Sequence, residues 1–222
     1  MFIGIDSLIF PRRCLICSVP DEPICTACAK VLRPRPKEIF GEDFRIFSSI
    51  AYDKAAAKMI LAAKEDGDRV ARRLVRSAIA ASLEELLKNL SISSDLGIVW
   101  IPSSRKAIRR RGGNYLAPIA RELANDFHES DLPRLMSDRA LLKQKKKVKD
   151  QSKLSASQRN LNLDGAFAAI GDFGLATPVA IIDDVITTGS TLRAAVQALR
   201  ERNLTIVGAA TACASQLRMP IR

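Results

Sequence analysis

The stretch VAIIDDVITTGSTL, residues 179–192, indicates the fold more clearly than any other part of the sequence. It opens with four apolar residues, a pattern typical of a buried strand, which run directly into Asp183 and Asp184. A short loop around Gly189 follows, and the pattern of a helix begins at Ser190. Ligands bind beyond the carboxyl ends of the strands in open α/β sheets, so this turn is a candidate binding site.

The two acids and the loop behind them differ in chemistry. Neighbouring carboxylates repel each other unless a ligand or cation lies between them. A vicinal diol would donate its hydroxyl groups to Asp183 and Asp184, and a nearby Mg²⁺ would offset their charge. The loop offers free N–H groups at a helix start, which favour a phosphate, and Gly189 permits positive φ. Two acids followed by a loop that favours a phosphate predict a site for a ribose 5-phosphate. The alternative is a structural turn in which the acids occur by chance. The loop residues are Thr187, Thr188, Gly189, Ser190 and Thr191.

Strand-like and helical patterns alternate along most of the chain. Strands are predicted at residues 44–52, 97–102, 179–183 and 205–214, and helices at 53–90, 114–127 and 190–203, the first broken at 66–68. Apolar strands that alternate with helices are typical of a parallel sheet with helices on both faces. We therefore expect one α/β domain over residues 41–222, preceded by a separate segment over residues 1–40 that ends in a linker.

Four of the five cysteines lie in CLICSVPDEPICTAC, residues 14–28. They form two C-x-x-C pairs, and two such pairs can place four thiolates around one ion. Zinc in a closed structural site is the favoured interpretation; a redox pair or Fe–S cluster and unligated thiols are the alternatives. The fifth, Cys213, lies in an apolar run and is expected to be a buried core residue. The candidate metal ligands are Cys14, Cys17, Cys25 and Cys28.

The net charge of +11, from 35 Lys and Arg against 24 Asp and Glu, favours anionic partners. Basic residues gather at 105–111 and at 143–149, where five of seven residues are lysine. The first cluster suits pyrophosphate, a solvated helix edge or a nucleic-acid backbone. The second suits a solvated loop or a lid over an anionic ligand. Aromatic residues make up 5% and do not alternate with the charges, which argues against a base-stacking surface.

Other features of the sequence narrow the class of protein. His128 is the single histidine, which excludes a mechanism that needs two, and its polar neighbours predict a solvated position. No apolar run approaches the roughly 18 to 20 residues of a membrane span. The first residues, MFIGIDSLIFPRRC, are not expected to form a signal peptide, because Asp6 interrupts their short apolar run, so a cytoplasmic location is expected.

The stretch at 179–192 closely resembles the phosphoribosyl-pyrophosphate (PRPP) signature of type I phosphoribosyltransferases. Four further segments are similar to the ComF-type competence proteins, which pair a four-cysteine zinc segment with a phosphoribosyltransferase domain. They are LIFPRRCLIC (8–17), MILAAKEDGD with Lys64 (59–68), IPSSRKAIRRRGGNYLAPIARELA (101–124) and DQSKLSASQRNLNLDGAF (150–167). The family's usual Arg-Gly-Phe-Asn-Gln is here residues 111–115, with Gly113 and Tyr115 in place of the aromatic residue and the amide.

The resemblance implies a type I phosphoribosyltransferase-like parallel sheet with an N-terminal four-cysteine zinc segment. It implies Mg²⁺-dependent transfer from PRPP to an unknown acceptor, with Asp183 and Asp184 on the ribose hydroxyls and the loop on the 5-phosphate. The family name points to DNA uptake in natural competence. The alternative is a non-catalytic accessory protein that binds PRPP or handles nucleic acid, with single-stranded DNA or the uptake machinery as its partner. The pyrophosphate candidates are Ser103, Ser104, Arg105, Lys106 and Arg111.

Overall fold

The computed structural model describes residues 13–39, 44–90, 94–127, 133–137, 140–145, 165–171 and 177–215. Its centre is a six-stranded sheet in the order β1-β2-β8-β7-β3-β4. The strands are β1 (Lys37–Ile39), β2 (Arg45–Ala51), β3 (Leu96–Trp100), β4 (Leu135–Met136), β7 (Val179–Ile186) and β8 (Ile206–Ala214). Every neighbouring pair is parallel except β1 with β2. The predicted parallel α/β sheet is therefore confirmed, with an antiparallel edge strand that forms from residues predicted as linker.

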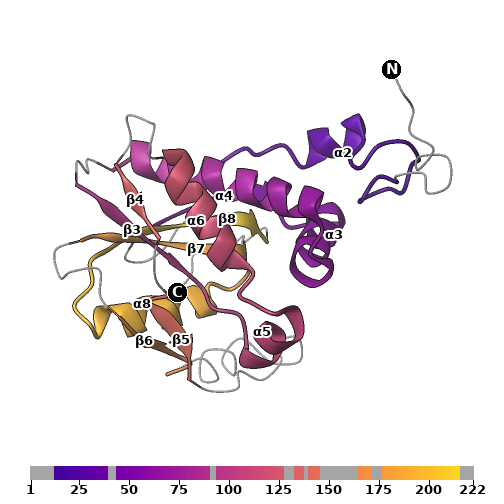
Figure 1. Ribbon diagram of the computed structural model, residues 1–222. Coiled ribbons are helices and arrows are strands. Elements are labelled where there is room, and N and C mark those ends of the chain that lie inside the picture. The colour runs from indigo at the N-terminus through magenta and orange to yellow at the C-terminus, as the bar shows by residue number, and fades with distance from the viewer. Residues whose placement is uncertain are drawn as a thin grey trace.

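Helices cover both faces of this sheet (Figure 1). Helices α4 (Arg69–Lys88) and α6 (Leu116–Phe127) pack on one face, α4 over β2 and β8 and α6 over β3 and β4. Helix α8 (Ser190–Arg200) lies on the other face beside a small sheet of β5 (Leu142–Gln144) and β6 (Phe167–Ala169). Burial follows sequence spacing: α4 buries Val75, Ile79 and Leu83, each four residues apart, and β3 is buried along its whole length.

The helical region ahead of β3 contains a turn that the sequence did not predict. Helix α3 (Lys54–Leu61) continues into η1 (Ala62–Asp66), a π-helical turn, before the chain reverses at Gly67, whose φ is 66°. Asp53 accepts hydrogen bonds from two backbone N–H groups at the start of α3, and Asp68 accepts one at the start of α4. The predicted break at residues 66–68 is thus confirmed. Single π turns occur frequently at functional sites.

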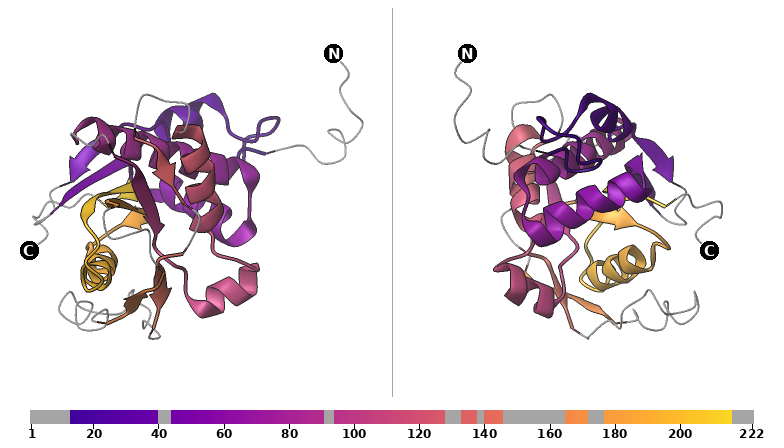
Figure 2. Two further views of the ribbon diagram at one scale, coloured as in Figure 1. Left: turned by 60° about the vertical axis from the view of Figure 1, so that its left-hand side comes forward. Right: turned by 90° about the vertical axis from the view of Figure 1, so that its right-hand side faces the viewer.

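The cysteine segment, residues 13–39, lies against the helices rather than apart from them. Figure 2 shows it beside α3 and α4, and it contains the short helix α2 (Thr26–Val31). Lys58 of α3 donates from Nζ to the carbonyl oxygen of Ile16 at 2.7 Å. Cys14 and Leu32 are buried and join the main hydrophobic core. The segment is therefore packed onto the domain as well as linked to it.

The chain leaves the two central strands in opposite directions. From β3 it passes through α5 (Arg105–Arg111) and α6 to β4, and from β7 it passes through α8 to β8 on the other side. Loops that diverge in this way leave a crevice in which open α/β sheets bind ligands. The pairing of β7 with β3 ends at Ile182, whereas its pairing with β8 continues to Ile186. Beyond Ile182, the edge of β7 that pairs with β3 earlier in the strand therefore borders this crevice.

Some predicted features lie outside the described residues. These are His128, residues 146–149 of the lysine-rich stretch, and residues 150–164 of the fourth ComF-like segment. Over the described ranges, every helix is too short or too polar to cross a membrane.

Candidate functional site

Asp183 and Asp184 point to opposite faces of the sheet, as neighbours in a strand do. Strand β7 continues through both residues to Ile186. The acids therefore lie within the strand, whereas the sequence had suggested that they stand at its end. Asp183 lines a hollow together with the start of α8. Asp184 is buried on the side of η1, where its Oδ2 lies 2.8 Å from Nζ of Lys64. The two side chains remain linked, because the backbone N–H of Asp184 donates to Oδ1 of Asp183 at 2.9 Å.

The Lys64–Asp184 ion pair is largely sheltered from water, with side-chain exposures of 35% and 7%. Burial by itself lowers the pKa of Lys64, but the charge of Asp184 and the hydrogen bond to it raise that pKa above its ordinary value. Lys64 therefore stays protonated at neutral pH. It supplies a fixed positive charge behind the acids.

Asp183 has a perturbed pKa. Burial raises the pKa of its carboxyl group well above the ordinary value, and the charge of Asp184 raises it further. The charge of Lys64 and the N–H of Asp184 act in the opposite direction but do not cancel these effects. A carboxylate in this position would be stabilised by hydroxyl donors or by a cation. Strongly perturbed acids in a crevice are typical of functional sites.

The hollow beside Asp183 is built from the turn between β7 and α8. The space inside it, part of which is open to solvent, measures about 280 Å³. All five residues of the predicted phosphate loop line it, namely Thr187, Thr188, Gly189, Ser190 and Thr191.

The start of α8 is open to an anion. Gly189 caps the helix with a φ of 72° and has no side chain to occupy its N-terminus, and the first turn contains no acidic residue. The hydroxyl groups of Thr188 and Ser190 bond to each other at 2.6 Å beside it. Free N–H groups and the positive end of the helix dipole favour a phosphate at such a position.

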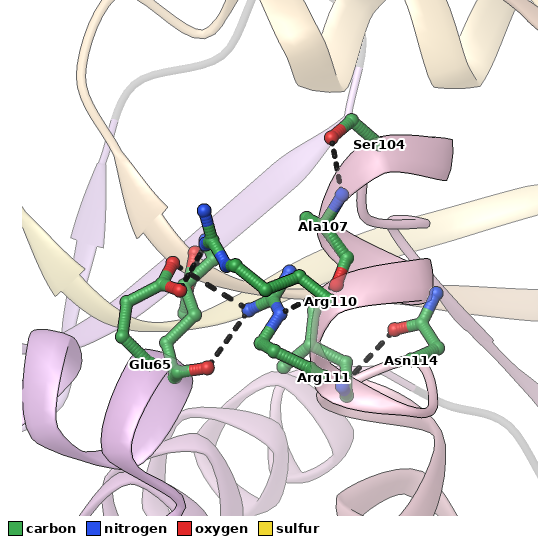
Figure 3. Close-up of polar contacts among 9 residues, drawn as sticks. Glu65, Ser104, Ala107, Arg110, Arg111 and Asn114 are labelled. Atoms are coloured by element: carbon green, nitrogen blue, oxygen red, sulfur yellow. Dashed lines mark hydrogen bonds and ion pairs between the residues drawn. The ribbon is translucent and has the colours of Figure 1, made fainter.

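On the other side of the crevice, the loop after β3 leads into α5. The hydroxyl of Ser104 accepts from the N–H of Ala107 at 3.2 Å and caps the helix (Figure 3). Arg105, Lys106 and Arg109 are exposed. This loop and the phosphate loop both follow central strands at the same edge of the sheet, which is where open α/β sheets bind ligands.

Glu65 holds the last residues of α5 against the π turn. Arg110 and Arg111 both form ion pairs with it (Figure 3). Arg111 also donates from Nη1 to the carbonyl oxygen of Lys64 at 3.0 Å. The predicted basic cluster is therefore divided, with these two arginines held and the others exposed. Sequence reasoning missed Glu65, and no local signal identifies it, because its partner Arg110 lies 45 residues away.

Tyr115 is a second residue to which sequence analysis gave no role. Its ring is buried directly before α6. Burial raises the pKa of its hydroxyl, as do the charges of Asp184, Cys213 and Asp183, whereas Arg111 lowers it; the net shift is upward. The hydroxyl therefore keeps its proton. Its only sequence signal was the departure from the family pattern at this position.

The four N-terminal cysteines meet as their spacing predicted. Their Sγ atoms all lie within 4.8 Å of one another, and those of Cys17 and Cys25 are 3.6 Å apart. A tetrahedral zinc site with Zn–S bonds of about 2.3 Å would place its sulfur atoms about 3.8 Å apart, so the cluster fits such an ion. Cys213, in contrast, is fully buried in β8, which confirms its assignment to the core.

The surroundings of these sulfur atoms shift the pKa values of two of the thiols in opposite directions. Burial raises the pKa of Cys14, but hydrogen bonds from the N–H groups of Cys17, Cys25 and Ile16 outweigh it and lower that pKa to about 6. Burial and the neighbouring cysteines raise the pKa of Cys28 to about 12. Four adjacent thiolates thus oppose one another unless a metal ion offsets their charge.

The family model of the phosphoribosyl transferase domain matches residues 110–218. The match includes β7, the phosphate loop and α8. Its description points to phosphoribosyl transfer or PRPP binding. No curated protein matches the chain. The chain thus combines a phosphoribosyl transferase domain with a four-cysteine cluster near its N-terminus.

Proposed function

We propose that this protein binds PRPP and transfers its phosphoribosyl group to an acceptor in an Mg²⁺-dependent reaction. One observation carries the proposal: Asp183 and the five residues of the phosphate loop line the same hollow, inside the matched domain. Carboxylate and helix N-terminus thereby lie next to each other, as a sugar with a phosphate on its C5 requires. The acceptor stays unassigned.

The proposed binding mode extends across the crevice in three parts. Asp183 and Asp184 accept hydrogen bonds from the ribose hydroxyls. The N-terminus of α8 binds the 5-phosphate, with Thr187, Thr188, Gly189, Ser190 and Thr191. The loop after β3 and helix α5 bind the pyrophosphate group, with Ser103, Ser104, Arg105, Lys106 and Arg111.

The transfer would break the bond between C1 of the ribose and pyrophosphate and form a bond from C1 to the acceptor. Positive charge develops on the sugar ring as the leaving group departs, and Asp183, which lines the hollow, lies beside the ring in this binding mode. Cationic side chains of α5 would stabilise the negative charge on pyrophosphate. The oxygen-rich donor set suits Mg²⁺, which when bound would neutralise charge on the diphosphate. No protein nucleophile is required.

For the N-terminal cluster we propose a structural zinc ion held by Cys14, Cys17, Cys25 and Cys28. Four protein ligands leave no open position for catalysis, so the ion would stabilise the segment that packs on α3. The division into a zinc segment with its linker (1–40) and a transferase-like domain (41–222) belongs to the same proposal.

The exposed cations of α5 support a second candidate function. Arg105, Lys106 and Arg109 project into solvent beside the crevice. With the ComF-type resemblance, this favours an accessory protein that contacts DNA during its uptake. Contacts to DNA phosphates would make the affinity fall steeply as salt rises. A salt titration with labelled single-stranded DNA tests this, and an affinity that does not change with salt would contradict it.

A screen for pyrophosphate release tests the proposed enzyme. PRPP and Mg²⁺ are incubated with the protein and a panel of nucleobases and other amines. At least one acceptor should give release above the acceptor-free rate, and the combined variant Asp183→Asn and Asp184→Asn should abolish both that release and PRPP binding. PRPP binding without release from any acceptor would favour the accessory protein. Undiminished PRPP binding by the double variant would remove the assignment of the ribose hydroxyls to these acids.

A further inference from the structure

Two polar atoms beside the acids are buried without a hydrogen-bond partner among the described residues. They are the hydroxyl oxygen of Tyr115 and Nη2 of Arg111. Tyr115 is 8% exposed, and the side chain of Arg111 is 10% exposed. Buried donors without partners are costly, typically about 1–3 kcal/mol for each group. Two such donors near the acids of β7 therefore indicate a place where a ligand completes the bonding.

Hydrogen bonds connect Arg111 to Asp184 through Lys64, and an electrostatic interaction connects Tyr115 to both acids. Arg111 ends α5, and the chain turns at Gly112, whose φ is 75°, to reach Tyr115 at the start of α6. Nη1 of Arg111 holds the carbonyl oxygen of Lys64, and Nζ of Lys64 holds Asp184. The charges of Asp183 and Asp184 also act on the Tyr115 hydroxyl. The phosphate loop thus lies beside Asp183, and the corner formed by Arg111 and Lys64 lies beside Asp184.

The type of donor indicates which part of a ligand lies here. A guanidinium group can only donate hydrogen bonds, so Arg111 requires an acceptor. A phenol that keeps its proton can donate to the same acceptor-rich group, whereas the acids require hydroxyl donors. In PRPP the diphosphate is attached to C1, beside the hydroxyl on C2 and away from the 5-phosphate. If the phosphate loop holds the 5-phosphate, the diphosphate extends toward α5 and Tyr115.

We propose that the Tyr115 hydroxyl and Nη2 of Arg111 both donate hydrogen bonds to phosphoryl oxygens of the bound diphosphate. Tyr115 then becomes a substrate-binding residue outside the sets that sequence analysis assigned, an inference that rests on the proposed function. Because the hydroxyl lacks a partner within the described part of the protein, its contribution should appear in ligand binding and not in folding.

The variant Tyr115→Phe tests this inference because it removes only the hydroxyl. Binding of PRPP, inorganic pyrophosphate and ribose 5-phosphate is measured by calorimetry with Mg²⁺, using the full chain. We expect the affinities for PRPP and pyrophosphate to fall roughly tenfold, the usual effect of one such hydrogen bond to a charged group. The affinity for ribose 5-phosphate, which lacks the diphosphate, should not change. The Tm without ligand should stay equal or rise, since an unpaired buried hydroxyl is removed.

The matched control is Tyr52→Phe, the same change at the other tyrosine, which is 40% exposed. It should leave all three affinities unchanged. Wild-type affinity of Tyr115→Phe for PRPP and pyrophosphate would overturn the inference alone, as would an equal loss for all three ligands, which indicates a structural role. A wild-type protein that binds neither PRPP nor ribose 5-phosphate would overturn the proposed function and the inference together.

Discussion

Lys64 and Asp184 lie 120 positions apart in the sequence, yet their side chains meet at 2.8 Å between Nζ and Oδ2. The lysine comes from a π turn and the acid from the last residues of a central strand. Their contact joins the helical half of the domain to the strand that carries the candidate site. It also leaves Asp183 as the acid that faces the hollow.

Replacing Lys64 with methionine should destabilise the fold. Asp184 would keep a buried negative charge without a partner, and breaking a buried pair in this way costs about 3–5 kcal/mol. Because a third of the Lys64 side chain is exposed, we expect a smaller loss, about 2 kcal/mol, in the free energy of unfolding measured by urea titration. The matched control is Lys88→Met, which breaks an exposed pair with Glu84 and should cost much less, because water screens exposed ion pairs. Equal losses in the two variants would contradict a special role for the Lys64 pair.

The raised pKa of Asp183 predicts how stability depends on pH. Its pKa in the folded state lies above the ordinary 3.8, so between these two values the folded state binds more protons than the unfolded state. Stability therefore falls as pH rises through this window, and the loss persists above it. Asp183→Asn should remove the loss, giving a more stable protein at neutral pH and a flatter pH profile, while PRPP binding decreases.

Urea titrations from about pH 4 to about pH 8 measure this effect across the window. Asp95→Asn, at an exposed position, serves as the control and should follow the wild-type profile. A lower stability of Asp183→Asn at neutral pH would show that the native state gains from the ionised carboxylate.

Metal analysis of the reduced protein should find about one Zn²⁺ per chain, as expected for a closed four-thiolate site. Chelation should release that ion and increase the reactivity of the cysteine thiols, because metal binding and local folding are coupled. Cys25→Ser should lower the metal content, whereas Cys213→Ala, in the core of β8, should not. A reduced, freshly purified chain without bound metal would disprove the zinc assignment.

Gly189→Ala tests the phosphate loop. With a φ of 72°, an alanine at this position is strained by about 1–2 kcal/mol. The variant should lose stability by that amount or shift the loop, and in either case bind PRPP more weakly, as a thermal melt and a calorimetric titration would show. Gly113→Ala is the control, since its φ is not positive and a Cβ there meets no atom within 4 Å. A Gly189→Ala protein with wild-type stability and affinity would rule out a tight, glycine-dependent loop.

The sequence predicted the elements whose pattern is local. The apolar runs gave β3, β7 and β8 to within a few residues, and the break at Gly67 was correct, because periodicity and turn residues depend on near neighbours. Strand β1 was missed, since three residues beside prolines and charges carry no strand pattern and form one only by pairing with β2. The end of β7 was also predicted too early, because the strand continues beyond Asp183 by pairing with β8.

The candidate site divides along the same lines. The phosphate loop is one continuous stretch, so its residues could be named in advance, and the structure places them around one hollow. The acids were found, but the contact of Asp184 with Lys64, 120 residues away, was not. Glu65 and Tyr115 gain their positions only when α5 and α6 fold against the π turn. Such long-range contacts leave no spacing to read in a single sequence.

The π turn at Ala62–Asp66 also determines the spacing and the rotation between residues of α3 and the residues that follow it. Lys58 meets the cysteine segment and Lys64 meets the acids, from the same continuous helical run. Removing one residue between them would rotate everything that follows by about 100° and shorten the run by about 1.5 Å. One of the two lysines would then point away from its partner. A π turn holds more residues than an α turn, and this turn thus sets the helical phase that lets one helical run contact the cysteine segment and Asp184 at once.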